Sequence, residues 1–130
     1  MFELSERGQD FRDRMTTFLD EHVHPAEPVY RQQMRDSGDP NHHPQVLEDL
    51  KAEARSQGLW NLFHPDPELG AGLTNLEYAH LAEVTGRSIE IAPEAINCNA
   101  PDTGNMEVLT LFGTDEHKER YLGPLLAGEI

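Results

Sequence analysis

Apolar residues recur along this chain at spacings of three and four, which is the pattern of helices that bury one face. The first such segment, Ser5 to Glu21, begins with a residue whose hydroxyl suits a helix N-cap. Its apolar stripe comprises Phe11, Met15, Phe18, Leu19 and His22. Pro25 and Pro28 interrupt the pattern, so we expect the first helix to end there and a short second helix to cover Pro28 to Arg35.

Two further helices are predicted in the middle of the chain. One runs from about Pro44 to Gln57, and Gly58 stands where a left-handed residue commonly ends a helix. The other runs from Asn75 to about Thr85. Its start is marked by Thr74 and Glu77, which have the spacing of a capping box.

The last third of the chain is cut into shorter segments by prolines and glycines. A helical stretch from Ile89 to Asn99 is expected to carry Pro93 in its first turn. After it, Asp102 or Thr103 is expected to cap a helix that Gly113 stops.

Thr114 is expected to cap the final helix, which Pro124 should kink or end near Leu122. No segment shows a sustained period of two with β-branched enrichment, which a strand would require. The pattern therefore predicts an all-α fold, an orthogonal or up-down bundle of about six helices.

Composition suggests a thin hydrophobic core. The chain has 130 residues, a length that fits one domain, but only 37% are hydrophobic, below the ~45–50% of an average globular protein. We therefore expect apolar surface to remain exposed, or to be covered by another chain. The expected places are the Leu59–Phe63 connector, the Asn97–Met106 turn and the stripe Tyr121, Leu122, Leu125, Leu126.

Charge narrows the class of partner. Ten basic and 24 acidic residues give a formal net charge of −14. This charge excludes nucleic-acid binding through a basic surface and disfavours binding to an anionic membrane.

No apolar run reaches the ~18–20 residues of a membrane span, and Met1 to Glu6 lacks the pattern of a signal peptide. The one cysteine, Cys98, suits a reducing compartment. We therefore expect a cytoplasmic protein, or one of the mitochondrial matrix if the source is eukaryotic.

Few residues suggest chemistry by their spacing alone. The pairs His22/His24 and His42/His43 lack the spacing of three or four that helical metal ligands need, so no metal site is predicted. Cys98 has no basic neighbour in sequence to activate it, and buried packing is favoured over a nucleophile.

The stretch Asn97–Glu107 is different, because it gathers small and amide residues around two helix breakers. Such a segment either lets a ligand approach the backbone closely or is simply a helix–turn–helix that Asp102 caps.

Several motifs of this region and its neighbours match one family. They are Gly72-Leu73-Thr74, Glu83 to Ser88, Ala92 to Cys98, Ala100 to Leu109, and a Gly-Thr-x-x-x-Lys-x-x-Tyr-Leu-x-Pro-Leu signature within Phe112 to Ile130. With them, essentially the whole chain resembles the amino-terminal helical domain of acyl-CoA dehydrogenases. The family fold continues into a β-barrel-like middle domain and a carboxy-terminal helical bundle. On this resemblance, residues 1–130 are the amino-terminal domain, and the middle and carboxy-terminal domains are absent.

The resemblance implies an oxidoreductase that uses FAD to remove two hydrogens from the α and β carbons of an acyl-CoA. A glutamate base takes the α proton and the flavin N5 takes a hydride, and an electron-transfer flavoprotein receives the electrons. No acidic residue of this chain is assigned as that base, so no catalytic residue is predicted. The chain alone is expected to be inactive and to bind no FAD tightly, whereas the intact enzyme is expected to be a homo-oligomer.

In the family, the amino-terminal domain walls the acyl-chain pocket. Aligning the Asp102–Met106 turn with the family places substrate-contacting positions at Ala95, Asn99, Thr103 and Met106. The first three are four apart, as one helical face requires, although Pro101 interrupts that face. A rival interpretation remains open, in which the chain is a stand-alone helical interaction module without catalysis.

Overall fold

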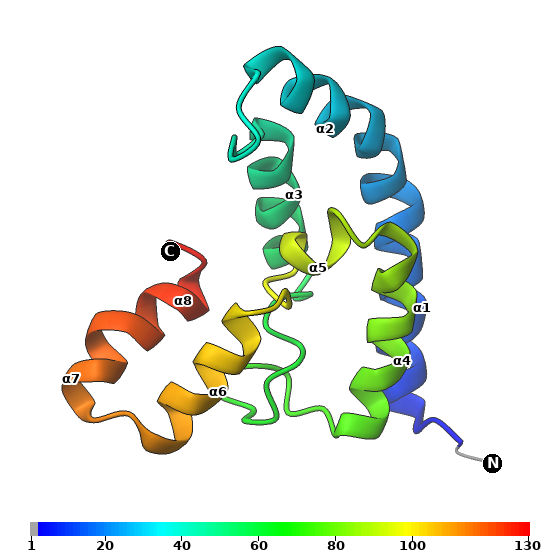
Figure 1. Cartoon of the computed structure of the whole chain (residues 1–130). Coiled ribbons are helices and arrows are strands. Elements are labelled where there is room, and N and C mark those ends of the chain that lie inside the picture. The colour runs from blue at the N-terminus through cyan, green and yellow to red at the C-terminus, as the bar shows by residue number, and fades with distance from the viewer. Residues whose placement is uncertain (1–2) are drawn as a thin grey trace.

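A computed structural model describes residues 3–130, and all regular secondary structure in this range is helical (Figure 1). The elements are α1 (Glu6–Phe18), the π-helical turn η1 (Leu19–Val23), α2 (His24–Ser37), α3 (Gln45–Ser56), α4 (Asn75–Thr85), the 3-10 turn η2 (Gly86–Ser88), α5 (Ala92–Ala95), α6 (Asp102–Phe112), α7 (Asp115–His117), the π-helical turn η3 (Lys118–Leu122) and α8 (Gly123–Ala127). Where consecutive elements abut they merge, which leaves six continuous helical stretches among these residues. The predicted all-α fold is confirmed. Met1 and Phe2, which belong to the segment examined for a signal peptide, lie outside the described residues.

The predicted break at Pro25 and Pro28 is wrong, because α1, η1 and α2 form one continuous helix. Proline cannot donate a backbone hydrogen bond and crowds the preceding turn of an α-helix. Here η1 comes immediately before α2, and the His24 amide bonds the Leu19 carbonyl five residues back. This π-helical turn shifts the hydrogen-bond register just ahead of Pro25, so the helix continues.

The predicted starts of α1, α4 and α7 are confirmed, and at each of them a side chain accepts a hydrogen bond from a backbone amide of the first turn. The Ser5 hydroxyl accepts from the Gly8 amide at 2.9 Å, and Thr114 caps α7 in the same way. At α4 the capping box is complete: the Glu77 amide donates to Thr74 Oγ1 (3.2 Å) and the Thr74 amide to Glu77 Oε2 (2.8 Å). Gly58 has the expected left-handed backbone, with φ 69°.

The last third departs further from the prediction. The stretch expected from Ile89 to Asn99 contains only the four-residue α5, because Asn97 turns into the left-handed region at φ 54°. The expected side-chain cap on α6 is also wrong, since Pro101 occupies the N-cap position and Asp102 is the first helical residue. Pro124 does not end the last helix near Leu122, because η3 precedes it and α8 continues to Ala127.

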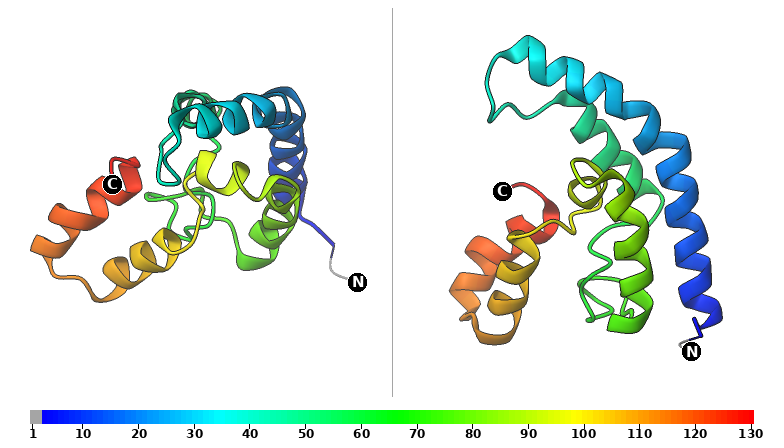
Figure 2. Two further views of the ribbon diagram at one scale, coloured as in Figure 1. Left: turned by 45° about the horizontal axis from the view of Figure 1, so that its top comes forward. Right: turned by 45° about the vertical axis from the view of Figure 1, so that its right-hand side comes forward.

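Two parts are visible in the overall arrangement. The first packs α1 against α4, and α3 against α2 and α5; the second is a hairpin in which α6 contacts η3 and α8 (Figures 1 and 2). The core joins them and includes Met15, Phe18, Leu59, Leu62, Leu81, Ile91, Ile96 and Met106, each with 0–1% of its surface exposed. Among residues 3–130, no helix combines the length and the apolar character needed to cross a bilayer.

The prediction of exposed apolar surface is largely wrong about the places. Of the residues named for it, Tyr121 is exposed, whereas the connector leucines, Met106, Leu122 and Leu125 are buried. Besides Tyr121 and Ile130, the exposed large apolar side chains of this half are three on α6: Val108 (58% exposed), Leu111 (71%) and Phe112 (79%), here called the α6 apolar face. Helical geometry places this face opposite Met106, which points into the core, so α6 has one buried and one open side.

Candidate functional site

The four residues predicted to contact substrate do not share one surface. Ala95 and Met106 are fully buried in the core, Asn99 is exposed on the turn, and Thr103 is half-buried in the first turn of α6. The left-handed Asn97 separates α5 from the turn, so spacing by four residues does not place these positions on one helical face. Their role in substrate binding stays a prediction.

The turn between α5 and α6 is held by two asparagines in left-handed conformations, Asn61 and Asn97. Asn97 Nδ2 donates to Asn61 Oδ1 at 2.7 Å and to the Leu125 carbonyl at 2.9 Å. Asn61 Nδ2 donates to the Leu126 carbonyl at 3.0 Å, as does Trp60 Nε1 at 2.8 Å. Asparagine tolerates the left-handed region better than most residues, which suits both positions. The pair therefore links the Asn97 end of the turn to the end of α8.

Thr103 lines a cavity of about 200 Å³, whose lining residues are Phe63, Asn75, Tyr78, Cys98, Thr103 and Glu107. Burial raises the pKa of Cys98 to about 11 and also raises the pKa of Tyr78, so both groups stay protonated at neutral pH. A thiol becomes nucleophilic as its pKa falls, so the structure supports the packing interpretation of Cys98. What the cavity offers is a mostly neutral wall with one carboxylate.

A second cavity of about 220 Å³ adjoins the first along α6 and shares Glu107 with it. Its deepest residue is His64, 2% exposed, which the sequence interpretation did not single out. His64 Nδ1 accepts from the Asp66 amide (3.2 Å), so Nε2 carries the proton and donates to Thr110 Oγ1 (3.1 Å). Thr110 in turn donates to the Met106 carbonyl at 2.7 Å. These hydrogen bonds tie the segment just after the Leu59–Phe63 connector to α6.

Replacing Thr110 with valine should test these hydrogen bonds. Valine keeps the shape but leaves His64 Nε2–H without its acceptor, so we expect the free energy of unfolding to fall by about 1–3 kcal/mol. Thr110→Ser, which keeps the hydroxyl, is the matched control and should lose much less. Urea denaturation of both variants measures the difference, and equal losses would show that the hydroxyl is not the group that matters.

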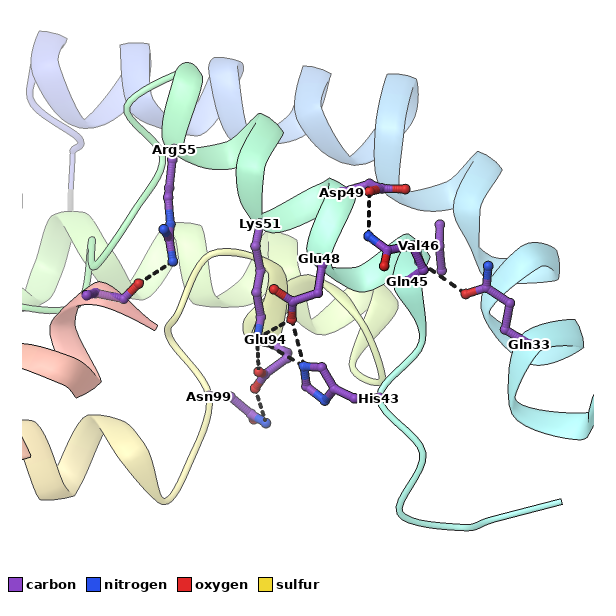
Figure 3. Close-up of polar contacts among 11 residues, drawn as sticks. Gln33, His43, Gln45, Val46, Glu48, Asp49, Lys51, Arg55, Glu94 and Asn99 are labelled. Atoms are coloured by element: carbon purple, nitrogen blue, oxygen red, sulfur yellow. Dashed lines mark hydrogen bonds and ion pairs between the residues drawn. The ribbon is translucent and has the colours of Figure 1, made fainter. Parts of the chain in front are cut away.

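A larger polar cavity of about 500 Å³ lies between α3, α5 and the segment after α8. On its wall, Lys51 has only 9% of its side chain exposed, and its Nζ lies 2.8 Å from Glu94 Oε1 and 3.2 Å from Glu48 Oε1 (Figure 3). His43 Nε2 lies 2.7 Å from the same Glu48 oxygen. Burial alone would raise the pKa of Glu48, but hydrogen bonds and charge from Lys51 and His43 outweigh it and hold the pKa below its usual value. Sequence alone could not single out Lys51, because its burial depends on these partners.

The chemistry of this cavity does not suit FAD, the cofactor that the resemblance implies. Proteins hold a pyrophosphate with helix N-termini, backbone amides and basic side chains. Here the lining offers the carboxylates of Glu48, Glu94, Asp102 and Glu129. Its two basic side chains, Lys51 and His43, already contact carboxylates of this set. Carboxylates repel a pyrophosphate, so we assign FAD no site on this cavity. Within residues 3–130, no three His, Cys, Asp or Glu side chains gather in a way that could hold a metal ion.

Comparisons with known proteins agree with the fold. A family model for the acyl-CoA dehydrogenase N-terminal domain matches residues 5–129. The probable acyl-CoA dehydrogenase FadE2 of Mycobacterium tuberculosis is 51% identical over 130 residues, and acyl-CoA dehydrogenase family member 10 of Mus musculus is 48% identical over 132 residues. A solved structure of a candidate acyl-CoA dehydrogenase from Mycobacterium abscessus superposes with a TM-score of 0.88 at 47% identity.

These relatives are much longer than this chain. The match covers 99% of this chain but 31% of FadE2, and 98% of this chain but 12% of the mouse protein. For the Mycobacterium abscessus structure the shares are 99% and 33%. The chain therefore spans about a third or less of the length of these proteins, and corresponds to one domain of them.

Proposed function

Because this chain belongs to the acyl-CoA dehydrogenase family as its N-terminal domain, we propose that it forms part of the acyl-chain pocket wall of an intact flavin-dependent dehydrogenase. The observation that carries the proposal is the family match over residues 5–129. The intact enzyme would remove hydrogens from the α and β carbons of an acyl-CoA thioester. We assign FAD and the catalytic base to the part of the protein beyond this domain.

Within this chain, the proposal divides the four predicted positions by their burial. Thr103, half-buried beside a cavity, would contact the acyl chain, and the exposed Asn99 would lie toward solvent. Ala95 and Met106 are fully buried, so they would not contact the substrate and would instead support α6 from within the core. A neutral, partly apolar surface with few charges suits a hydrocarbon chain.

The α6 apolar face supports a role for this domain inside a larger protein. Val108, Leu111 and Phe112 are each more than half exposed and lie on one side of one helix. Contiguous exposed apolar surface commonly marks an interaction site. We propose that the remainder of the intact enzyme covers this face.

We also propose, from the family, that the intact enzyme is a homo-oligomer. It would pass its electrons to an electron-transfer flavoprotein.

The rival function is a stand-alone helical interaction module, which the same apolar face would also serve. The mass of the native protein distinguishes the two. We expect a native chain about three times the 14.7 kDa of these residues, in proportion to FadE2. A native mass equal to that of the 130 residues would favour the module.

A simple experiment tests whether this domain can act alone. We expect the 130-residue chain, mixed with FAD and an acyl-CoA, to retain no flavin on gel filtration and to reduce no dye, because the large cavity beside Lys51 is lined by carboxylates and we assign the catalytic base to the rest of the enzyme. Absorbance at the flavin bands and dye reduction measure both. Stoichiometric flavin or turnover would overturn the assignment of FAD and catalysis to the rest of the enzyme.

A further inference from the structure

Lys51 is a costly residue to bury, and its surroundings show what the burial achieves. Lysine is almost never fully buried unless it is paired, because removal of an ammonium from water is unfavourable. Here its two carboxylate partners come from different elements: Glu48 from the same helix, α3, and Glu94 from α5. The Glu94 pair is the shorter, at 2.8 Å, and it joins two segments that lie 43 positions apart in the sequence.

The element that receives this ion pair cannot hold its own position. α5 has four residues, far fewer than an isolated helix needs to be stable. Its place depends on contacts with its neighbours, and α3 is one of the elements on which it packs. Glu94 is the one charged residue of α5, so its pair with Lys51 is the directional contact between the two helices.

The same carboxylate continues the network into the turn. Glu94 Oε2 accepts from Asn99 Nδ2 at 3.4 Å, while Oε1 faces Lys51 (Figure 3). The Asn99 backbone carbonyl then accepts from the Thr103 amide at 3.1 Å, in the first turn of α6. A continuous path of polar contacts therefore runs from Lys51 to the start of α6.

We propose that Lys51 is a positioning residue, whose buried ammonium sets the course of the Asn97–Pro101 turn and the start of α6 through Glu94 and Asn99. The importance of this position for substrate rests on the proposed function, in which Thr103 belongs to the pocket wall. Glu48 and His43 hold the ammonium from the other side and do not reach the turn. That asymmetry makes the proposal testable, because the two carboxylates should have different effects.

The experiment compares four variants of the 130-residue chain by ¹⁵N NMR and amide hydrogen exchange. In Lys51→Met and Glu94→Gln we expect the Asn99 side-chain amide and the Thr103 amide to shift, and exchange at Thr103 to rise about tenfold or more as the local structure opens. Amides of α1 and α4 should keep their protection. Glu48→Gln, the matched control on the same ammonium, should leave the Asn99 and Thr103 signals in place, and Lys51→Arg should restore them toward the native positions.

Three results would overturn the proposal: unchanged Asn99 and Thr103 signals in a folded Lys51→Met chain, an equal effect of Glu48→Gln, or a loss of protection spread evenly through α1 and α4. If Lys51→Met does not fold, Glu94→Gln decides, since it keeps Lys51 paired with Glu48. None of these measurements involves substrate. Failure of the proposed function would instead appear in the intact enzyme or a chimera that contains this domain, as missing dehydrogenase activity, so the two failures are distinguishable.

Discussion

Phe18→Ala is expected to lower the free energy of unfolding of this chain by about 3–5 kcal/mol. Phe18 lies at the end of α1 with none of its surface exposed, inside the core that joins the helices. Truncation removes its buried ring and leaves a cavity that close-packed neighbours fill only in part. Urea denaturation monitored by far-ultraviolet circular dichroism measures the change.

Phe112 provides the matched control, because the same substitution there removes a ring that is 79% exposed. We expect Phe112→Ala to change the stability of the 130-residue chain by no more than about 0.5 kcal/mol. In an intact enzyme that covers the α6 apolar face, Phe112→Ala should cost clearly more than this. Equal losses for Phe18 and Phe112 in the isolated chain would contradict the packing described here.

The parts of the fold that the sequence predicts well are those decided by local contacts. The side chains of Thr74 and Glu77 each accept a hydrogen bond from the other residue's backbone amide, so their spacing alone identifies the start of α4. Ser5 and Thr114 cap their helices for the same local reason. A residue pattern of this kind needs no knowledge of distant segments.

The prolines show where local rules fail. Pro25 and Pro124 each follow a π-helical turn, η1 and η3, and the helix continues through both. A π-helical turn changes which residues of the helix face its neighbours, so it depends on tertiary packing. The positions of the prolines alone do not reveal it. The short α5 is a similar case, because the left-handed Asn97 that ends it is held by Asn61 and the Leu125 carbonyl.

The candidate site was less predictable than the fold. The family resemblance points to the α5–α6 region, and the role of that region in substrate binding stays a prediction. The burial of Ala95 and Met106 is visible only in the packed structure. The burial of Lys51 and His64 could not be predicted from the sequence for a physical reason. A polar side chain can be buried only where partners satisfy it, and here those partners lie far away in sequence. The low hydrophobic content is likewise compatible with a largely buried Leu59–Phe63 connector, and three of the exposed large apolar side chains lie together on α6.

The central claim is that this chain works as the N-terminal domain of an acyl-CoA dehydrogenase. A chimera tests it most directly, in which residues 1–130 replace the matching third of the Mycobacterium abscessus relative, which is 47% identical. The controls are that relative itself and its remainder without any N-terminal domain. The chimera should regain activity that the remainder lacks, because this chain superposes on the relative over 99% of its length with a TM-score of 0.88.

The decisive measurement is the rate of acyl-CoA-dependent dye reduction by the purified, flavin-loaded chimera. Misplacement of a pocket wall by about 1 Å can cost about 100-fold in rate, so the account predicts a kcat/KM within about 100-fold of the relative's value. A chimera that is folded and binds flavin, yet is no more active than the remainder alone, would contradict it.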